Sequence, residues 1–67
     1  MSVARVTEIS ATSPDSFDAA VKEGIDRANK TLRNVTSAWV KEQRCKIEDG
    51  KISHYQVNLM VTFMLDD

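Results

Sequence analysis

The sequence predicts an α+β fold in which a three-stranded antiparallel sheet partly wraps around one helix, in the order β-α-β-β. Two patterns predict it. Apolar residues recur at steps of three and four before residue 36, and at every second position near the end of the chain. With 67 residues the chain is short, and we expect one domain spanning residues 1–67.

The first expected element is a strand from about residue 4 to residue 10. Val6 and Ile9 stand on opposite parities, so the pattern does not tell which face of this strand is buried. A strand is nevertheless favoured over a loop.

A helix is expected next, running to about Arg33. Ser13 is a suitable N-cap residue, and Pro14 suits the first helical position, where its missing N–H costs nothing. Gly24 lies within the apolar stripe, so we expect another element to approach it closely. The stripe consists of Phe17, Ala20, Val21, Gly24, Ile25, Ala28, Leu32 and Val35.

The chain ends in a predicted β-hairpin. Asp49-Gly50 is a typical two-residue hairpin loop, and residues 35–48 would form the partner strand. The last strand is indicated by six alternating apolar positions: Tyr55, Val57, Leu59, Val61, Phe63 and Leu65.

The hairpin should extend beyond the helix. Strands of about 14 residues span roughly 46 Å, whereas a helix of about 20 residues covers roughly 30 Å. A single cysteine, Cys45, cannot form an intramolecular disulfide. Copies of the same chain are then the simplest cover for the uncovered sheet, so we expect a homo-oligomer.

A two-residue loop also predicts the hairpin register and therefore the face turned away from the helix. Trp39 offers a stacking surface there, and Gln56 can both donate and accept at the edge of a flat polar ligand. The alternative, which the residue types favour, is that Trp39 and Met60 fill a subunit interface. The predicted pairs on this face are Ser37/Thr62, Trp39/Met60, Lys41/Asn58, Gln43/Gln56 and Cys45/His54.

Several function classes are disfavoured. The net charge is −1 and the basic residues are dispersed, which argues against nucleic acid as a partner. No apolar run is long enough to span a membrane, no apolar signal segment opens the chain, and a lone cysteine suits a reducing compartment, so we expect a cytoplasmic protein. Cys45 and His54 lack an orienting acid and an oxyanion-hole loop, so no enzyme is expected.

A cation site is a further alternative. Glu48, Asp49 and the terminal pair Asp66-Asp67 could hold a hard cation such as calcium across an oligomer axis. They lack any EF-hand spacing, and solvated charges are the simpler interpretation.

Taken together, the segments of the chain resemble a dodecin over nearly the whole length, without an insertion. No single motif is highly specific, but their order and spacing are. The matching segments are Thr12-Ser13-Pro14, Ala28 to Asn34, Val40-Lys41-Glu42, Arg44, Asp49-Gly50, His54-Tyr55-Gln56-Val57 and Val61-Thr62-Phe63.

The resemblance implies a hollow homododecamer that binds flavin (riboflavin, FMN or FAD) between aromatic side chains and stores or sequesters it without turnover. Gln56 matches the glutamine that reads the isoalloxazine edge, and Arg44 matches a basic position able to approach phosphate. Ser37 stands where flavin-binding dodecins have their stacking tryptophan. Trp39 lies two residues along the strand, about 6.6 Å away on the same face.

The family also suggests a second possibility. Some dodecins lack the stacking tryptophan and resemble assemblies that bind a cation such as calcium, or no ligand at all. The pair Glu42-Gln43 is similar to that branch.

Overall fold

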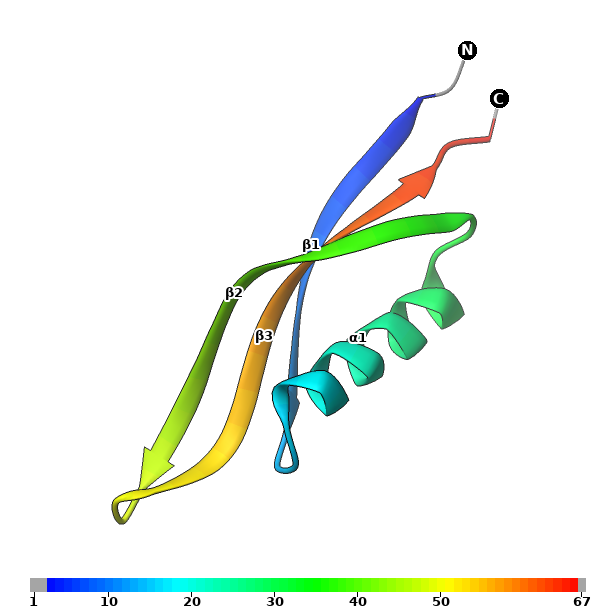
Figure 1. Ribbon diagram of the computed structural model, residues 1–67. Helices are drawn as coiled ribbons and strands as arrows, with labels where there is room; N and C mark the ends of the chain where they lie inside the picture. Colours follow the sequence, from blue (N-terminus) through cyan, green and yellow to red (C-terminus); the bar gives the residue numbers. More distant parts are fainter. Residues whose placement is uncertain (1–2, 67) are drawn as a thin grey trace.

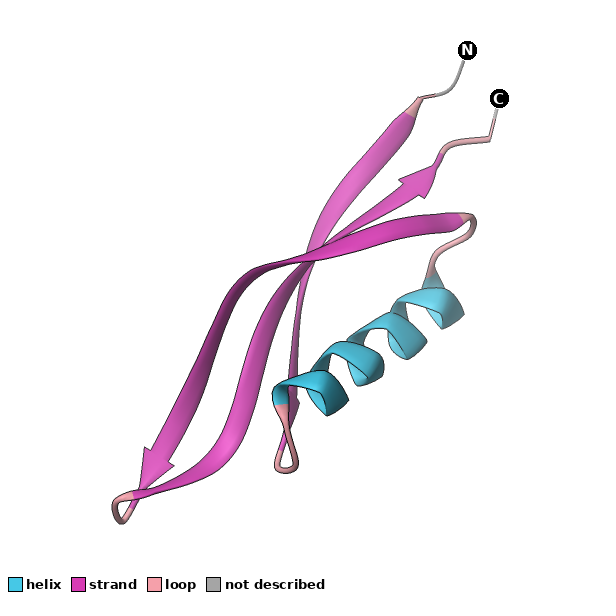
Figure 2. Ribbon diagram, in the orientation of Figure 1, coloured by secondary structure: helices cyan, strands magenta, loops and turns pink. Residues whose placement is uncertain are grey.

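The computed structural model describes residues 3–66, and it confirms the β-α-β-β order. The elements are β1 (Ala4–Ser13), α1 (Phe17–Thr31), β2 (Val35–Glu48) and β3 (Lys51–Met64). β3 lies between β1 and β2 and pairs antiparallel with both. The single helix lies along one face of this sheet (Figures 1 and 2).

β1 continues three residues beyond its predicted end, because Thr12 and Ser13 still pair with Gln56 and Tyr55. The register also settles which face of β1 is buried. Ile9 pairs with Leu59 and packs against the core, whereas Val6 is exposed.

The helix begins later than predicted. Its N-cap is Ser16, whose Oγ accepts a hydrogen bond of 2.9 Å from the Ala19 N–H. The Ser13 hydroxyl instead accepts from the Asp15 N–H within the turn that leaves β1. The prediction of Ser13 as N-cap and Pro14 as first helical residue is therefore wrong, because sheet pairing holds Ser13 in the strand. Over residues 3–66, no helix is long and apolar enough to cross a membrane.

The core lies between α1 and the half of the sheet nearest the chain termini. Gly24 is buried, and a Cβ added to it would lie 2.8 Å from Leu59 Cδ1 and 3.2 Å from Ala11 Cβ. This confirms the close approach expected at Gly24. The buried hydrophobic residues are Ala20, Ala28, Val57, Leu59 and Val61.

The hairpin extends beyond the helix even further than expected. β2 and β3 have 14 residues each, but α1 has only 15, which corresponds to about 22 Å of helix. The molecule measures 51 × 19 × 13 Å, and in Figure 1 the yellow hairpin turn lies well beyond the start of α1. Ile47 and Ile52, near this turn, are 59% and 49% exposed.

The hairpin loop is Asp49-Gly50, as predicted. Both residues have positive φ, 52° and 75°, which is the backbone that Asp-Gly favours in a two-residue turn.

The hairpin register is confirmed at Ser37/Thr62 and Trp39/Met60, and again beside the turn at Ile47/Ile52 and Glu48/Lys51, but it is wrong between them, over residues 42–46. Irregularities after Val35, Val40 and Lys46 interrupt the pairing. One extra residue in one strand displaces the following pairs and turns their side chains to the other face. The observed partners are Glu42/Asn58, Gln43/Val57, Arg44/Gln56, Cys45/Tyr55 and Lys46/His54.

This shift changes which side chains share the sheet face turned away from α1. Arg44 replaces Gln43 as the partner of Gln56. Cys45 and His54 are no longer partners and point to opposite faces of the hairpin. We call this surface the outer face; its β3 residues are His54, Gln56, Asn58, Met60 and Thr62.

Candidate ligand-binding face

Gln56 stands near the middle of the outer face, where the three strands lie side by side. Its Nε2 donates to Ser10 Oγ on β1 at 2.9 Å, and to Asn58 Oδ1 two residues along β3 at 3.5 Å. The Gln56 side chain is thus held by Ser10 of β1 on one side and by Asn58 of its own strand, β3, on the other. Both of these bonds use the amide nitrogen.

Arg44 lies directly opposite Gln56 on β2. Its guanidinium binds the Glu42 carboxylate, with Nη2 2.6 Å from Oε2, and both side chains are about half exposed. The bulge after Val40 is what brings Arg44 to this face. The Arg44 guanidinium and the Gln56 amide therefore lie side by side on exposed surface, next to the Glu42 carboxylate.

Trp39 and Ser37 lie further along the same face. Trp39 pairs with Met60 and is 50% exposed, and Ser37 pairs with Thr62. Met60 is four residues from Gln56, or about 13 Å along an extended strand. The structure therefore brings Arg44 and Gln56 together, and places Trp39 and then Ser37 progressively further away.

Two residues of β1, Glu8 and Ser10, belong to this face but were not predicted. Glu8 Oε1 lies 3.2 Å from Lys41 Nζ, and its Oε2 accepts from Asn58 Nδ2 at 3.3 Å. They were missed because the facing of β1 was undetermined. The alternation of polar Glu8, Ser10 and Thr12 with apolar Ile9 and Ala11 was the available signal.

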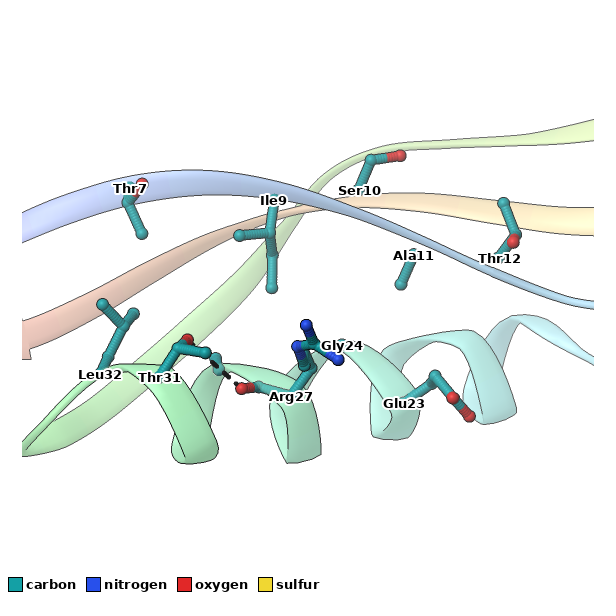
Figure 3. A pocket seen from close by; sticks show the side chains of 11 residues that line it. Thr7, Ile9, Ser10, Ala11, Thr12, Glu23, Gly24, Arg27, Thr31 and Leu32 are labelled. Carbon is teal, nitrogen blue, oxygen red and sulfur yellow. Dashed lines mark hydrogen bonds between the residues drawn. The ribbon is translucent and has the colours of Figure 1, made fainter.

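A pocket lies elsewhere, as an open groove of about 570 Å³ between β1 and α1. Figure 3 shows Ile9 and Ala11 pointing into it from the strand, with Arg27 and Glu23 on the helix side. None of Ser37, Trp39, Arg44 or Gln56 lines this groove, so the outer face remains the candidate site.

The acidic groups considered for a cation are separated within one chain. Glu48 and Asp49 lie at the hairpin turn and Asp66 at the opposite end of the sheet (Figure 1); Asp67 lies outside the described residues. Asp66 accepts from Asn34 Nδ2 at 3.0 Å and lies 3.5 Å from Arg33 Nη1. Within residues 3–66, no three His, Cys, Asp or Glu side chains are grouped to hold a metal ion.

Comparison with known proteins gives a consistent result. The family model described as Dodecin matches residues 3–66. The dodecin of Thermus thermophilus is 37% identical over 65 residues, covering 97% of this chain and 94% of the relative.

Two solved structures extend the comparison. The dodecin from Streptomyces davaonensis superposes with a TM-score of 0.93 at 44% identity, covering 98% of this chain and 97% of its own. The calcium dodecin from Mycobacterium tuberculosis, described as calcium-chelating with a calcium-binding site, gives 0.83 at 34% identity, covering 96% and 91%.

Proposed function

The chain belongs to the dodecin family, and we propose that it binds flavin (riboflavin, FMN or FAD) as a hollow homododecamer of single-domain subunits. The protein stores or sequesters the ligand in the cytoplasm and does not turn it over. The observation that carries this proposal is the neighbouring placement of Gln56 and Arg44 on an open sheet face that also bears Trp39.

The residue types on this face suit a flavin. Gln56 would bind the polar edge of the isoalloxazine ring, and Arg44 would approach the phosphate of FMN or FAD. Trp39 would stack on the ring from its displaced position, and Ser37 would leave open the space that the family's tryptophan fills. A bound flavin would supply a redox-active ring, which the protein would shield.

Assembly is supported by the apolar surface that one chain leaves exposed. Trp39, Val40, Ile47 and Ile52 are between 42% and 59% exposed, and all lie on the hairpin. Copies of the same chain would cover this surface.

A flavin titration tests the proposal. We expect the fluorescence of riboflavin and FMN to be quenched at micromolar protein. Gln56→Ala should weaken binding about tenfold, because it removes the group that reads the ring edge. Gln43→Ala is the matched control, since Gln43 turns to the opposite face of the hairpin. Unchanged flavin fluorescence in the wild-type protein would refute flavin binding.

Calcium binding without flavin is the second candidate, and the similarity to the calcium dodecin favours it. One chain does not gather a ligand set within its described residues. Carboxylates of several copies, such as Glu48, Asp49 and Asp66, would have to meet at a symmetry axis.

A thermal-shift experiment separates the two candidates. If calcium is the ligand, the purified protein is colourless, its melting temperature rises with CaCl₂ and falls with EDTA, and riboflavin has no effect. A melting temperature that neither CaCl₂ nor EDTA moves would remove the calcium candidate.

A further inference from the structure

The outer face carries a continuous chain of hydrogen bonds across all three strands. Lys41 Nζ on β2 donates to Glu8 on β1 at 3.2 Å, and Glu8 accepts from Asn58 Nδ2 on β3 at 3.3 Å. Asn58 Oδ1 then accepts from Gln56 Nε2 at 3.5 Å, and the same nitrogen donates to Ser10 Oγ at 2.9 Å.

The chemistry of Glu8 determines which group donates and which accepts in each of these hydrogen bonds. An ionised carboxylate can only accept hydrogen bonds, so Asn58 must turn its NH₂ group toward Glu8. The amide oxygen of Asn58 then points toward Gln56, and Gln56 must donate to it from its own NH₂ group. Lys41 can only donate, so it reinforces the accepting role of Glu8.

The consequence is that Gln56 Oε1 is left available. Within residues 3–66 no hydrogen bond engages this oxygen, although Gln56 is only partly exposed. Arg44, the cation opposite it, binds Glu42 at 2.6 Å instead. The group that the face offers to a ligand at this point is an acceptor.

We propose that Glu8 and Asn58 are positioning residues that fix the amide oxygen of Gln56 outward, so that the site selects planar heterocycles carrying an N–H at their edge. This inference rests on the proposed function and specifies it. The imide N–H of the flavin pyrimidine ring, between two carbonyl groups, is such a donor. Gln56 would offer no free donor to a ring that presents only acceptors at that edge.

The test compares riboflavin with N3-methylriboflavin, which lacks this N–H. We expect the wild-type protein to bind the methylated flavin about tenfold more weakly. Glu8→Gln keeps the shape of residue 8 but allows it to donate, which frees Asn58 and Gln56 to rotate. The discrimination ratio should then fall at least about threefold.

Two further variants isolate the directional role. Ser10→Ala removes one acceptor for Gln56 Nε2 but leaves Glu8 in place, so the ratio should stay at the wild-type value even if affinity falls. Glu23→Gln removes the same charge on α1, where it lines the groove and not the outer face. Its ratio should also be unchanged.

The outcomes separate this inference from the proposed function. If the wild-type protein binds neither flavin, both are overturned. If it binds both flavins equally, or if Glu8→Gln discriminates as strongly as the wild type, flavin binding stands and the positioning role of Glu8 and Asn58 is overturned. If only the bulk of the methyl group weakened binding, Glu8→Gln would discriminate between the two flavins as strongly as the wild type.

Discussion

The two halves of the β2–β3 hairpin differ in how much of β3 is buried. Near the termini β3 lies against α1, and Val57, Leu59 and Val61 are at most 1% exposed. Beyond the helix, the part of the hairpin formed by residues 42–54, here called the arm, contains no buried residue. One end of the same sheet is stabilised within the chain, and the other depends on its backbone pairing and on neighbours.

The covered half should be the more sensitive to substitution, and Leu59→Ala should have the largest effect. Leu59 fills the contact between β3 and Gly24 of α1, so truncation leaves a cavity and should cost about 2 to 5 kcal/mol. Urea denaturation measures this. Leu65→Ala, at an exposed leucine outside the arm, should stay within about 0.5 kcal/mol, and equal losses at the two positions would show that burial of Leu59 against α1 does not set the cost.

The two glycines lie in different halves of the molecule, and each is required for a different reason. Gly24→Ala should destabilise the protein by about 1 to 2 kcal/mol, because the crowding against Leu59 and Ala11 exceeds the gain in helix propensity. Asn29→Ala, on the exposed side of the same helix, should instead stabilise it slightly. A Gly24→Ala protein that melts above the wild type would show that the contact yields easily.

Gly50→Ala in the arm should cost less, about 1 kcal/mol. A Cβ there meets nothing within 4 Å, so the cost comes only from the φ of +75°. Gly50→Asn should recover most of the loss, because asparagine tolerates this backbone. The melting temperatures of the three proteins check this, and equal losses for alanine and asparagine would argue against backbone strain.

The smallest effect on a single chain should come from Ile52→Ser, at a half-exposed side chain of the arm. We expect an unchanged far-ultraviolet circular dichroism spectrum, and a change of folding free energy within about 0.5 kcal/mol. If copies cover the arm as proposed, the mass measured by light scattering should fall on dilution more readily than in the wild type. A mass identical to the wild type at every concentration would contradict coverage of Ile52 by another copy.

The sequence predicted the elements of both halves of the hairpin, but not the pairing of residues 42–46 in the arm. The period-two pattern of β3 and the Asp49-Gly50 loop are local signals, and both were confirmed. The bulge after Val40 has no such signal, because it depends on how β2 twists along β3. Missing it placed Gln43, and not Arg44, beside Gln56.

The contacts of β1 were also beyond the reach of local patterns. No tight turn joins β1 to β3, so nothing in the sequence fixes their register, and the bond from Gln56 to Ser10 could not be anticipated. The choice between Ser13 and Ser16 as N-cap depends on the same pairing, since Ser13 is held opposite Tyr55. The identity of the elements was readable, but the register of β1 and of residues 42–46 was not.

The pairing of β1 with β3 also brings residues 3 and 65 together, with the Leu65 N–H donating to the Val3 carbonyl at 3.0 Å. The start of β1 and the end of β3 lie at the end of the sheet opposite the hairpin turn (Figure 1). A short linker could therefore join these ends, and the chain could be reopened between Asp49 and Gly50 as a circular permutant. In such a protein β3 and β1 would become a continuous hairpin. The new termini would lie at the tip of the arm, where an attached label would report on the surface that packs against it.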